Sequence, residues 1–431
     1  MMMRRNNNRA KTRLMDLPTE TLIDILKRLP VKSVCCIRCV SKTLSDIVYS
    51  PFFVDLHTRF LIPTNSLAAG TSPQLVLRLA ASNIVIPRRK LTVLESLKND
   101  YSKGELTTHN ASDVILCTSH KEYYSTVPFV FYDLICYKHG YDRDGNCFLI
   151  NPLCGEVLRI PISNILYTKI GKELGFIFDR YGMGFDDITH TYKIIRVSRV
   201  YKRPFYSESL VAQLLVLGTS SWREISMPSV PCCANFYATK SVCAYGDMHW
   251  LFTEEGDPAG RVQIVSFDFK KEEFYFTPIP VASHMPNLHL IALGESIAIV
   301  DTTHSSSGIE IWLMKDYNTK EWNREHIITR QMLGLDVVDF EFYWANCGEM
   351  EYGIYFIDQK GAKLLFVDLR LPSIKCVTYP ISKEWKGCQR IINLKRSLIS
   401  LKKFGNLVQD PNISEGGQSL LRFGKKYLWQ D

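Results

Sequence analysis

Cysteine and glycine residues with spacings suited to metal or phosphate binding occur at two places in this chain. The segment Cys36-Ile37-Arg38-Cys39 has the spacing of half a zinc site. No second Cys or His pair follows at a usable distance, and the segment lies within a helical pattern, so we interpret it as part of a helix face. The segment Gly182-Met183-Gly184 precedes a strand and a turn, whereas a phosphate-binding loop needs a following helix. Neither spacing predicts a bound ligand.

Histidine and carboxylate side chains come close in sequence between positions 284 and 304. His284 and His289 flank a Pro-Asn loop, and Asp301 and His304 follow. Sequence spacing alone does not bring these four residues together, and a surface loop accounts for them. The chain contains no nucleophile elbow, no H-E-x-x-H segment and no P-loop. We therefore predict a non-catalytic protein with no metal and no cofactor.

Composition indicates a folded protein with more than one domain. The 431 residues are 46% hydrophobic and 12% aromatic, which is ample for a buried core. The 13 cysteines follow an N-terminal stretch without an apolar core segment. We expect reduced thiols and a protein of the nucleus or cytosol that is not secreted. No apolar run reaches membrane-spanning length, so a membrane partner is not expected.

The net charge of +8 is concentrated in residues 1–14, which contain no acidic side chain. Five of these charges come from Arg4, Arg5, Arg9, Lys11 and Arg13, and three remain for the rest of the chain. Such a segment is typical of a basic flexible tail, and we do not predict nucleic acid as a partner.

Three short helical patterns follow within residues 15–57. The first begins near Pro18, where a missing N–H costs nothing, and ends at Pro30. Its apolar positions recur at helical spacing and are Leu22, Ile25, Leu26 and Leu29. The second pattern consists of Val31, Val34, Ile37 and Val40. The third begins at Ser41, a favourable N-cap, and ends before Pro51 after Leu44, Ile47 and Val48. A unit this small is expected to dock on the rest of the chain or on a partner.

This segment resembles an F-box, the docking module of substrate receptors in cullin-based ubiquitin ligases. The residues that carry the resemblance are Leu17-Pro18, Ile25-Leu26, Leu29-Pro30-Val31-Lys32-Ser33 and Arg38-Cys39-Val40-Ser41-Lys42. The resemblance implies binding to a Skp-family adaptor and, through it, to a cullin. We predict an adaptor-facing or adjacent apolar set of Leu17, Pro18, Leu22, Ile25, Leu26, Leu29, Pro30, Val40 and Leu44.

Two positions depart from the pattern of the F-box family. Leu44 stands where an aromatic residue, most often Trp, is usual, and Cys36 stands where Arg is common. Large aromatic anchors often dominate the energy of an interface. The departures therefore predict weaker adaptor binding than in a typical member.

From Val114 onward the chain is a succession of hairpin patterns. Each unit is a strand, a turn opened mostly by Asp or Asn, and an aromatic or β-branched return strand. The units lie at 148–160, 183–197, 215–225, 265–276, 309–322 and 364–377. Repeated hairpins over this length predict a β-propeller, with a pair of packed β-sandwich domains as the alternative. The tryptophans expected to pack its blades are Trp222, Trp250, Trp312 and Trp322.

Several short sequence segments of these units resemble the F-box-associated domain of plant F-box proteins. They are Asp133-Leu134-Ile135-Cys136, Asn151-Pro152, Gly184-Phe185-Asp186 with Tyr192-Lys193, Gly218-Thr219-Ser220-Ser221-Trp222-Arg223, Gly246-Asp247-Met248-His249-Trp250-Leu251 and Ile311-Trp312-Leu313-Met314. The resemblance implies a kelch-like propeller that binds a target protein. The paired glycines of true kelch blades are missing, which favours the F-box-associated domain.

We thus expect a mainly β fold with a small α-helical N-terminal module. The expected parts are a basic flexible tail (1–14), an F-box (15–57), a linker with the first strands (58–110), an F-box-associated β-propeller-like domain (111–402) and a loosely ordered tail (403–431). The expected function is substrate recognition in a Skp-cullin-F-box ubiquitin ligase. A propeller hydrolase or lectin, and a non-ligase interaction module with a degenerate F-box, are the alternatives.

Overall fold

Four helices open the part of the chain that the computed structural model describes. The described residues are 16–61, 75–86, 89–100, 105–117, 127–138, 147–151, 156–164, 174–202, 207–227, 234–235, 241–254, 262–281, 287–294, 296–303, 308–333, 346–350, 353–358, 363–369, 375–380, 388–394, 397–408 and 421–423. The helices are α1 (Thr19–Leu26), α2 (Val31–Ile37), α3 (Lys42–Val48) and α4 (Pro51–Leu61). The first three confirm the sequence pattern. The fourth was not expected, because Pro51 begins a new helix as its first residue in addition to ending the previous one.

Beyond the helices, five antiparallel sheets are each built from consecutive strands. The first consists of β4 (Val130–Phe131), β5 (Leu134–Lys138), β6 (Cys147–Asn151) and β7 (Glu156–Arg159), and the second of β8 (Leu174–Asp186), β9 (Thr191–Lys202), β10 (Ser207–Val216) and β11 (Arg223–Ile225). The third contains β12 (Ala234–Asn235), β13 (Val242–Ala244), β14 (Asp247–Glu254), β15 (Val262–Asp268) and β16 (Glu273–Pro278). The fourth contains β17 (Leu288–Leu293), β18 (Ser296–Asp301), β19 (Ile309–Asp316) and β20 (Glu321–Ile328), and the fifth β21 (Asn346–Met350), β22 (Gly353–Asp358), β23 (Lys363–Asp368) and β24 (Lys375–Pro380).

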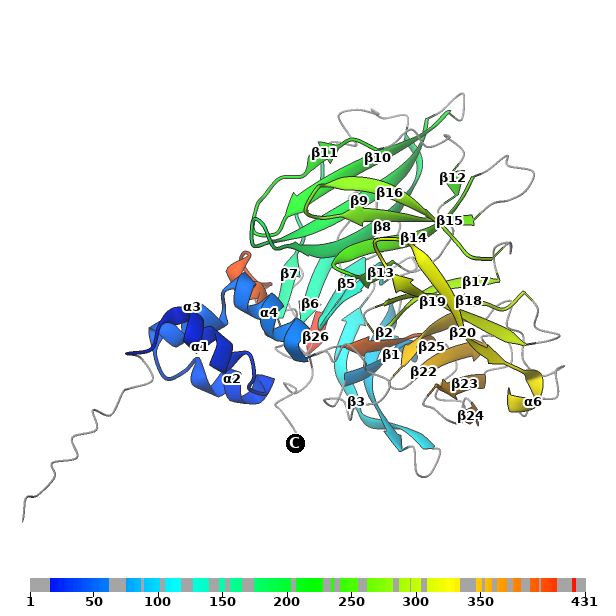
Figure 1. Cartoon of the computed structure of the whole chain (residues 1–431), viewed down its shortest axis with the longest axis horizontal. Coiled ribbons are helices and arrows are strands. Elements are labelled where there is room, and N and C mark those ends of the chain that lie inside the picture. Colours follow the sequence, from blue (N-terminus) through cyan, green and yellow to red (C-terminus); the bar gives the residue numbers. More distant parts are fainter. Residues whose placement is uncertain are drawn as a thin grey trace, which may run out of the picture.

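A further sheet joins the two ends of the strand-rich region. Its order is β25 (Cys388–Leu394), β1 (Leu75–Ile86), β2 (Arg89–Asp100), β3 (Glu105–Cys117) and β26 (Leu421–Phe423). Strand β25 also contacts β21 and β4, so this sheet closes the ring between the first and last of the five blades. The sheets fan around a common centre, and the helices lie at one side (Figure 1). The architecture is a β-propeller, and the sandwich alternative is wrong.

The six expected hairpins are all present. They are the pairs β6–β7, β8–β9, β10–β11, β15–β16, β19–β20 and β23–β24. Their turns begin where the sequence has Asp, Asn or a Gly-Thr-Ser-Ser stretch, which are residues that stabilise turns through local hydrogen bonds or a positive φ. Turn chemistry was therefore the reliable local signal.

Two domain boundaries differ from the sequence-based expectation. Residues 403–408 are not a loose tail: Leu407 bridges Leu158, and the amide of Val408 donates to the carbonyl of Val157 at 3.0 Å. Helix α4 extends to Leu61, four residues beyond the expected end of the helical module. The predicted tails at 1–14, 409–420 and 424–431 lie outside the described residues.

One apolar cluster is shared by the helices and the first two blades. From the helices it contains Leu26, Val31, Val34, Leu44, Val48, Phe53 and Val54, and from the blades Phe129, Phe131, Leu134, Leu149, Phe185 and Tyr192 among others. The small helical module thus docks on its own chain, as its size requires. Among the described helices, none has the length and apolar character needed to cross a membrane.

Candidate functional site

The helical module is held in shape by caps and by a brace from α4. The Ser41 hydroxyl accepts a hydrogen bond from the amide of Leu44 at 3.2 Å, which confirms Ser41 as the N-cap of α3. The buried His57 ring of α4 lies 2.8 Å through its Nε2 from the carbonyl of Leu29. Burial lowers the pKa of His57, so the ring is neutral at pH 7. The brace fixes α4 against the end of α1.

The nine residues predicted to face or adjoin the adaptor fall into two groups. Leu22, Leu26 and Leu44 are buried inside this chain, with exposed fractions of 3%, 1% and 2%. The residues at or near the surface are Leu17, Pro18, Ile25, Leu29, Pro30 and Val40. Leu29 packs in part against the shared apolar cluster. The buried leucines therefore support the helices from within and do not form a free surface.

The outer face of the helices carries exposed apolar side chains. Val40 is 74% exposed and Ile25 is 39% exposed. Pro18 and Pro30 are exposed at the starts of α1 and α2, and Cys36 is exposed on α2. Val40 and Ile25 are thus open to another protein, while the buried side chains of the helices belong to the apolar cluster shared with the first two blades.

Comparison with protein families assigns both parts of the chain. Residues 14–55 match the F-box domain, and residues 82–392 match the F-box associated beta propeller domain. The chain belongs to the F-box proteins with an F-box-associated β-propeller. The second match covers most of the chain; it begins within β1 and includes β2, which the sequence had placed in a linker region with the first strands.

Curated relatives of this F-box protein come from Arabidopsis thaliana. The F-box/LRR-repeat protein At2g43260 is 26% identical over 321 residues, which cover 73% of this chain and 67% of the relative. F-box protein CPR1 is 22% identical over 326 residues, which cover 72% of each chain. The putative F-box protein At3g23960 is 26% identical over 350 residues, which cover 78% of this chain and 80% of the relative. The match supports the plant origin expected from the resemblance.

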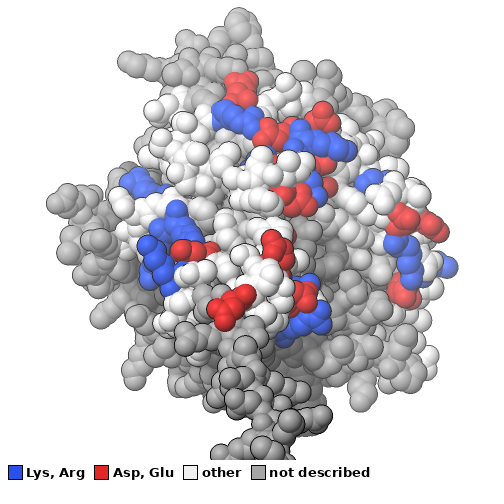
Figure 2. Space-filling model, turned by 60° about the vertical axis from the view of Figure 1, so that its left-hand side comes forward, with Lys and Arg blue, Asp and Glu red and all other residues white. Residues whose placement is uncertain are grey.

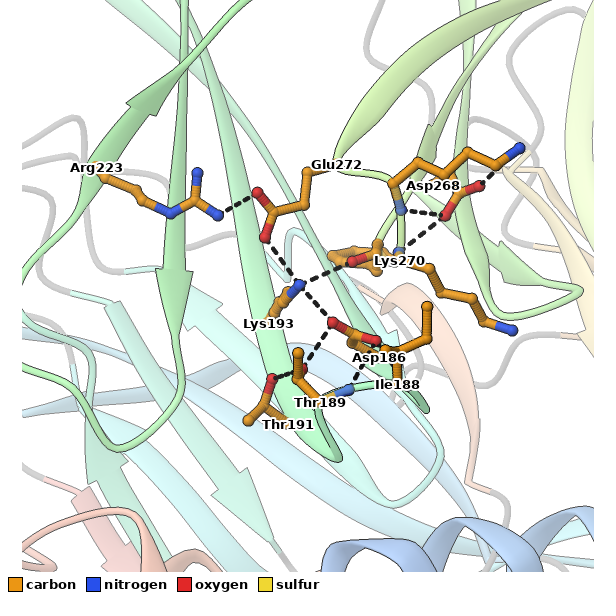
Figure 3. A network of polar contacts seen from close by, with 11 residues as sticks. Asp186, Ile188, Thr189, Thr191, Lys193, Arg223, Asp268, Lys270 and Glu272 are labelled. Carbon is orange, nitrogen blue, oxygen red and sulfur yellow. Dashed lines mark hydrogen bonds and ion pairs between the residues drawn. The ribbon is translucent and has the colours of Figure 1, made fainter.

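In the F-box-associated domain, the segments Gly184-Phe185-Asp186 and Tyr192-Lys193 take part in a network of ion pairs between the second and third blades. This network, which we call the clamp, consists of Asp186, Lys193, Arg223 and Glu272. The Nζ of Lys193 lies 2.7 Å from Oδ2 of Asp186 and 2.8 Å from Oε1 of Glu272, and donates to the carbonyl of Phe269 at 3.0 Å. Arg223 pairs with the other oxygen of Glu272. Figure 3 shows Lys193 between the two carboxylates, with the β8–β9 turn on one side and the β15–β16 turn on the other.

The electrostatics of this clamp favour the charged carboxylates. Burial raises the pKa of Asp186, but hydrogen bonds from Lys193 and Thr189 outweigh it and hold the pKa at about 2. The pKa of Glu272 is also lowered, because Arg223 and Lys193 outweigh the effect of burial. The ammonium of Lys193 has all three donors satisfied within the chain. The clamp is thus a structural link and offers no free group for chemistry.

Aspartates open three hairpin turns in the same way. Oδ1 of Asp186, Asp268 and Asp316 accepts hydrogen bonds from the amides two and three residues further on. Each turn contains a non-glycine residue with positive φ just before the return strand, namely His190, Glu272 and Lys320. Asx turns of this kind compensate for the cost of that backbone conformation.

A buried ion cluster links the first two blades. Asp179 of β8 accepts from Lys138 of β5 at 2.5 Å, from Arg196 of β9 at 3.1 Å and from Ser198 at 2.7 Å. The Asp179 and Arg196 side chains are only 2% and 5% exposed. No pattern in the sequence indicated that these residues are in contact, because Lys138 and Asp179 lie 41 positions apart.

The tryptophans have structural positions in the blades. Trp250 is 1% exposed and donates through Nε1 to Ser241 Oγ at 2.9 Å. Trp222 donates to the carbonyl of Pro161 at 2.7 Å and so joins the second blade to the first. Trp312 and Trp322 pack against the cluster between the third and fourth blades. All four confirm the expected packing role.

The motifs that could have held a ligand do not assemble in the described residues. Cys36 lies on α2 and Cys39 in the following turn, and no group of His, Cys, Asp or Glu among the described residues could hold a metal. Gly182 and Gly184 lie within β8 and contact Met248 and Phe269. His289 and Asp301 lie on paired strands, while His284 and His304 are outside the described residues. On the face in Figure 2, basic and acidic side chains are interspersed over the described part.

Close packing requires a glycine at position 184, at the start of the Gly184-Phe185-Asp186 segment. This requirement gives a first prediction. A Cβ on Gly184 would lie 2.1 Å from Cδ2 of Phe269, whose ring is fully buried and cannot move away. We expect Gly184→Ala to lower the free energy of unfolding by about 2–3 kcal/mol, as overpacking does. Gly182→Ala should also lose stability, since its Cβ would lie 2.4 Å from Cγ of Met248, which is 0% exposed. Urea denaturation measures both losses, and an unchanged free energy of unfolding in Gly184→Ala would contradict the packing argument.

Proposed function

We propose that this chain is the substrate-recognition subunit of a Skp-cullin-F-box ubiquitin ligase. The observation that carries the proposal is the exposure of Val40 and Ile25 on the F-box module, while Leu26 and Leu44 are buried in the cluster shared with the first two blades. The match of residues 14–55 to the F-box domain supports a docking role for these exposed apolar side chains. The family match supports a substrate-receptor type of protein, and the ligase complex is our inference from it.

In this proposal the chain performs no bond chemistry itself. The F-box binds the Skp-family adaptor, which holds the cullin, and the propeller binds a target protein. Holding the target near the ligase makes ubiquitin transfer effectively intramolecular, and the gain in rate comes from effective concentration.

The adaptor-binding surface can be tested with exposed residues, which can change without loss of the fold. We expect the Ile25→Asp, Val40→Asp double variant to lose co-purification with a plant Skp-family adaptor, with affinity reduced by at least tenfold. Two carboxylates in an apolar interface would lose their hydration without a partner. Leu26→Asp is unsuitable, because Leu26 is 1% exposed and the change would disrupt the core of the module.

Ile188→Asp is the matched control. Ile188 is 73% exposed, close to the 74% of Val40, but it lies in the β8–β9 turn of the propeller. We expect this variant to bind the adaptor like the wild type. Failure of the folded wild-type chain to bind would favour the alternative, a non-ligase interaction module in which the Leu44 and Cys36 departures have removed adaptor binding.

A further inference from the structure

Residues 397–408 lie between the F-box helices and the propeller. Leu398, Ile399 and Leu401 are buried in the apolar cluster that contains residues of both parts. The segment includes the short helix η6 (Leu401–Lys403), which lies beside β7 and near the start of α4 (Figure 1). The sequence had placed residues 397–402 at the end of the propeller-like domain and residues 403–408 in a loosely ordered tail.

The first half of this segment is bound to the first blade by buried polar groups. Asp133, which is 0% exposed in the β4–β5 turn, accepts a hydrogen bond from the hydroxyl of Ser397. Asn151 at the end of β6 donates to the carbonyl of Ile399 at 2.9 Å and to Asp133 at 3.3 Å. The contacts of Asp133 with Ser397 and of Asn151 with Ile399 join residues 264 and 248 positions apart.

Glu156 at the start of β7 holds the next turn. Its carboxylate accepts from the amide of Leu401 at 2.6 Å and from the hydroxyl of Ser400 at 3.2 Å. The Glu156 side chain is 6% exposed, so these hydrogen bonds satisfy a buried charge. The blade therefore fixes the backbone of the segment on one side.

The other side of the segment contacts the helices and the second blade. Lys403 Nζ donates to the carbonyl of Tyr49, just after α3, at 3.0 Å and lies 5.0 Å from the centre of its ring. The ring of Phe404 packs edge-on against Tyr192 of β9 at 5.8 Å. Phe52 of α4 also contacts His190 of the second blade directly, with a distance of 5.2 Å between the two ring centres.

We propose that residues 397–408 form a strap that locks the F-box helices in one orientation on the propeller. The strap is anchored to the blade through Asp133, Asn151 and Glu156, and it reaches the helices through Lys403 and the shared core. The inference goes beyond the proposed function and does not depend on it. In a ligase receptor, the same lock would fix the distance between the adaptor and the target.

Hydrogen exchange on the full-length chain tests the strap without any ligase activity. In the Lys403→Ala, Phe404→Ala variant we expect amides of α3 and α4 to exchange about tenfold faster, because undocking of the helices becomes easier. The β15–β16 hairpin is the internal reference and should exchange as in the wild type. Unchanged exchange in α3 and α4 would overturn the proposal.

Two further variants separate the strap from general unfolding. Lys402→Ala is the matched control, since the Lys402 side chain is 69% exposed and pairs with Glu156 of the blade at 3.6 Å. It should leave α3 and α4 unchanged, and faster exchange there would count against a specific role of Lys403. If the double variant also loosens the reference hairpin, Lys403→Met decides: it keeps most of the apolar stem, and we expect about threefold faster exchange confined to α3, α4 and the strap.

Discussion

Replacing Asp179 by Ala is expected to lower the free energy of unfolding by about 3–5 kcal/mol, the range for removing one partner of a buried ion pair. The change would leave Lys138 and Arg196 buried between two blades with no carboxylate to neutralise them. Ser198 would also lose its acceptor. Urea denaturation at pH 7, followed by tryptophan fluorescence, measures the loss.

The charge state of Asp179 sets the pH range of this contribution. Burial raises the pKa of its carboxyl, but Arg196 and Lys138 outweigh burial and hold the pKa far below its usual range. A carboxyl whose pKa is lowered by folding stabilises the native state above its unfolded pKa of about 4. That stability is lost as the pH falls below this value, so the full effect of the substitution is present at pH 7.

Asp187→Ala is the control for Asp179→Ala. Asp187 pairs with Lys270 at 2.7 Å between the same two hairpins that carry the clamp, but the two side chains are 37% and 42% exposed. An exposed ion pair contributes about 0–1 kcal/mol. A loss as large for Asp187 as for Asp179 would show that burial does not distinguish the two pairs.

Local signals in the sequence predicted most of the fold. Ser41 as an N-cap and the Asp residues at hairpin turns act on their own neighbours within three positions, so their effect can be inferred without a structure. Pro51 was ambiguous, because proline both ends one helix and begins another. Helix periodicity likewise showed that Leu22 and Leu26 share a face, but not what that face contacts.

Contacts between distant segments could not be predicted from one sequence. Lys193 and Glu272 lie 79 positions apart, and Lys403 lies 354 positions from Tyr49. Leu44 shows the same limit, because it belongs to the set predicted to face or adjoin the adaptor and is buried in the apolar cluster that the helices share with the first two blades. Only the fold reveals that the inner side of the helices is covered by the chain itself.

The buried carboxyl of Asp133 gives the second large effect, which depends on pH. Burial raises its pKa to about 7, against the hydrogen bonds from Ser397 and Asn151 that lower it. In the unfolded chain the pKa is about 4. Between about pH 4 and pH 7 the native state therefore holds a proton that the unfolded state has released, and stability falls as the pH rises. The expected loss from this group is roughly 4 kcal/mol over that range.

Asp133→Asn isolates this contribution, because the amide cannot titrate. Carboxylates with lowered pKa, such as Asp186 and Glu272, gain stability mainly below about pH 4 and do so equally in both proteins, so they cancel in the difference between wild type and variant. The variant places an amide beside the Asn151 amide and so loses a hydrogen bond, but that loss is independent of pH. We expect the wild type to lose stability relative to the variant as the pH rises from 4 to 8. A constant difference would mean that Asp133 is ionised throughout, and that the strap is anchored by a charged carboxylate at every pH in that range.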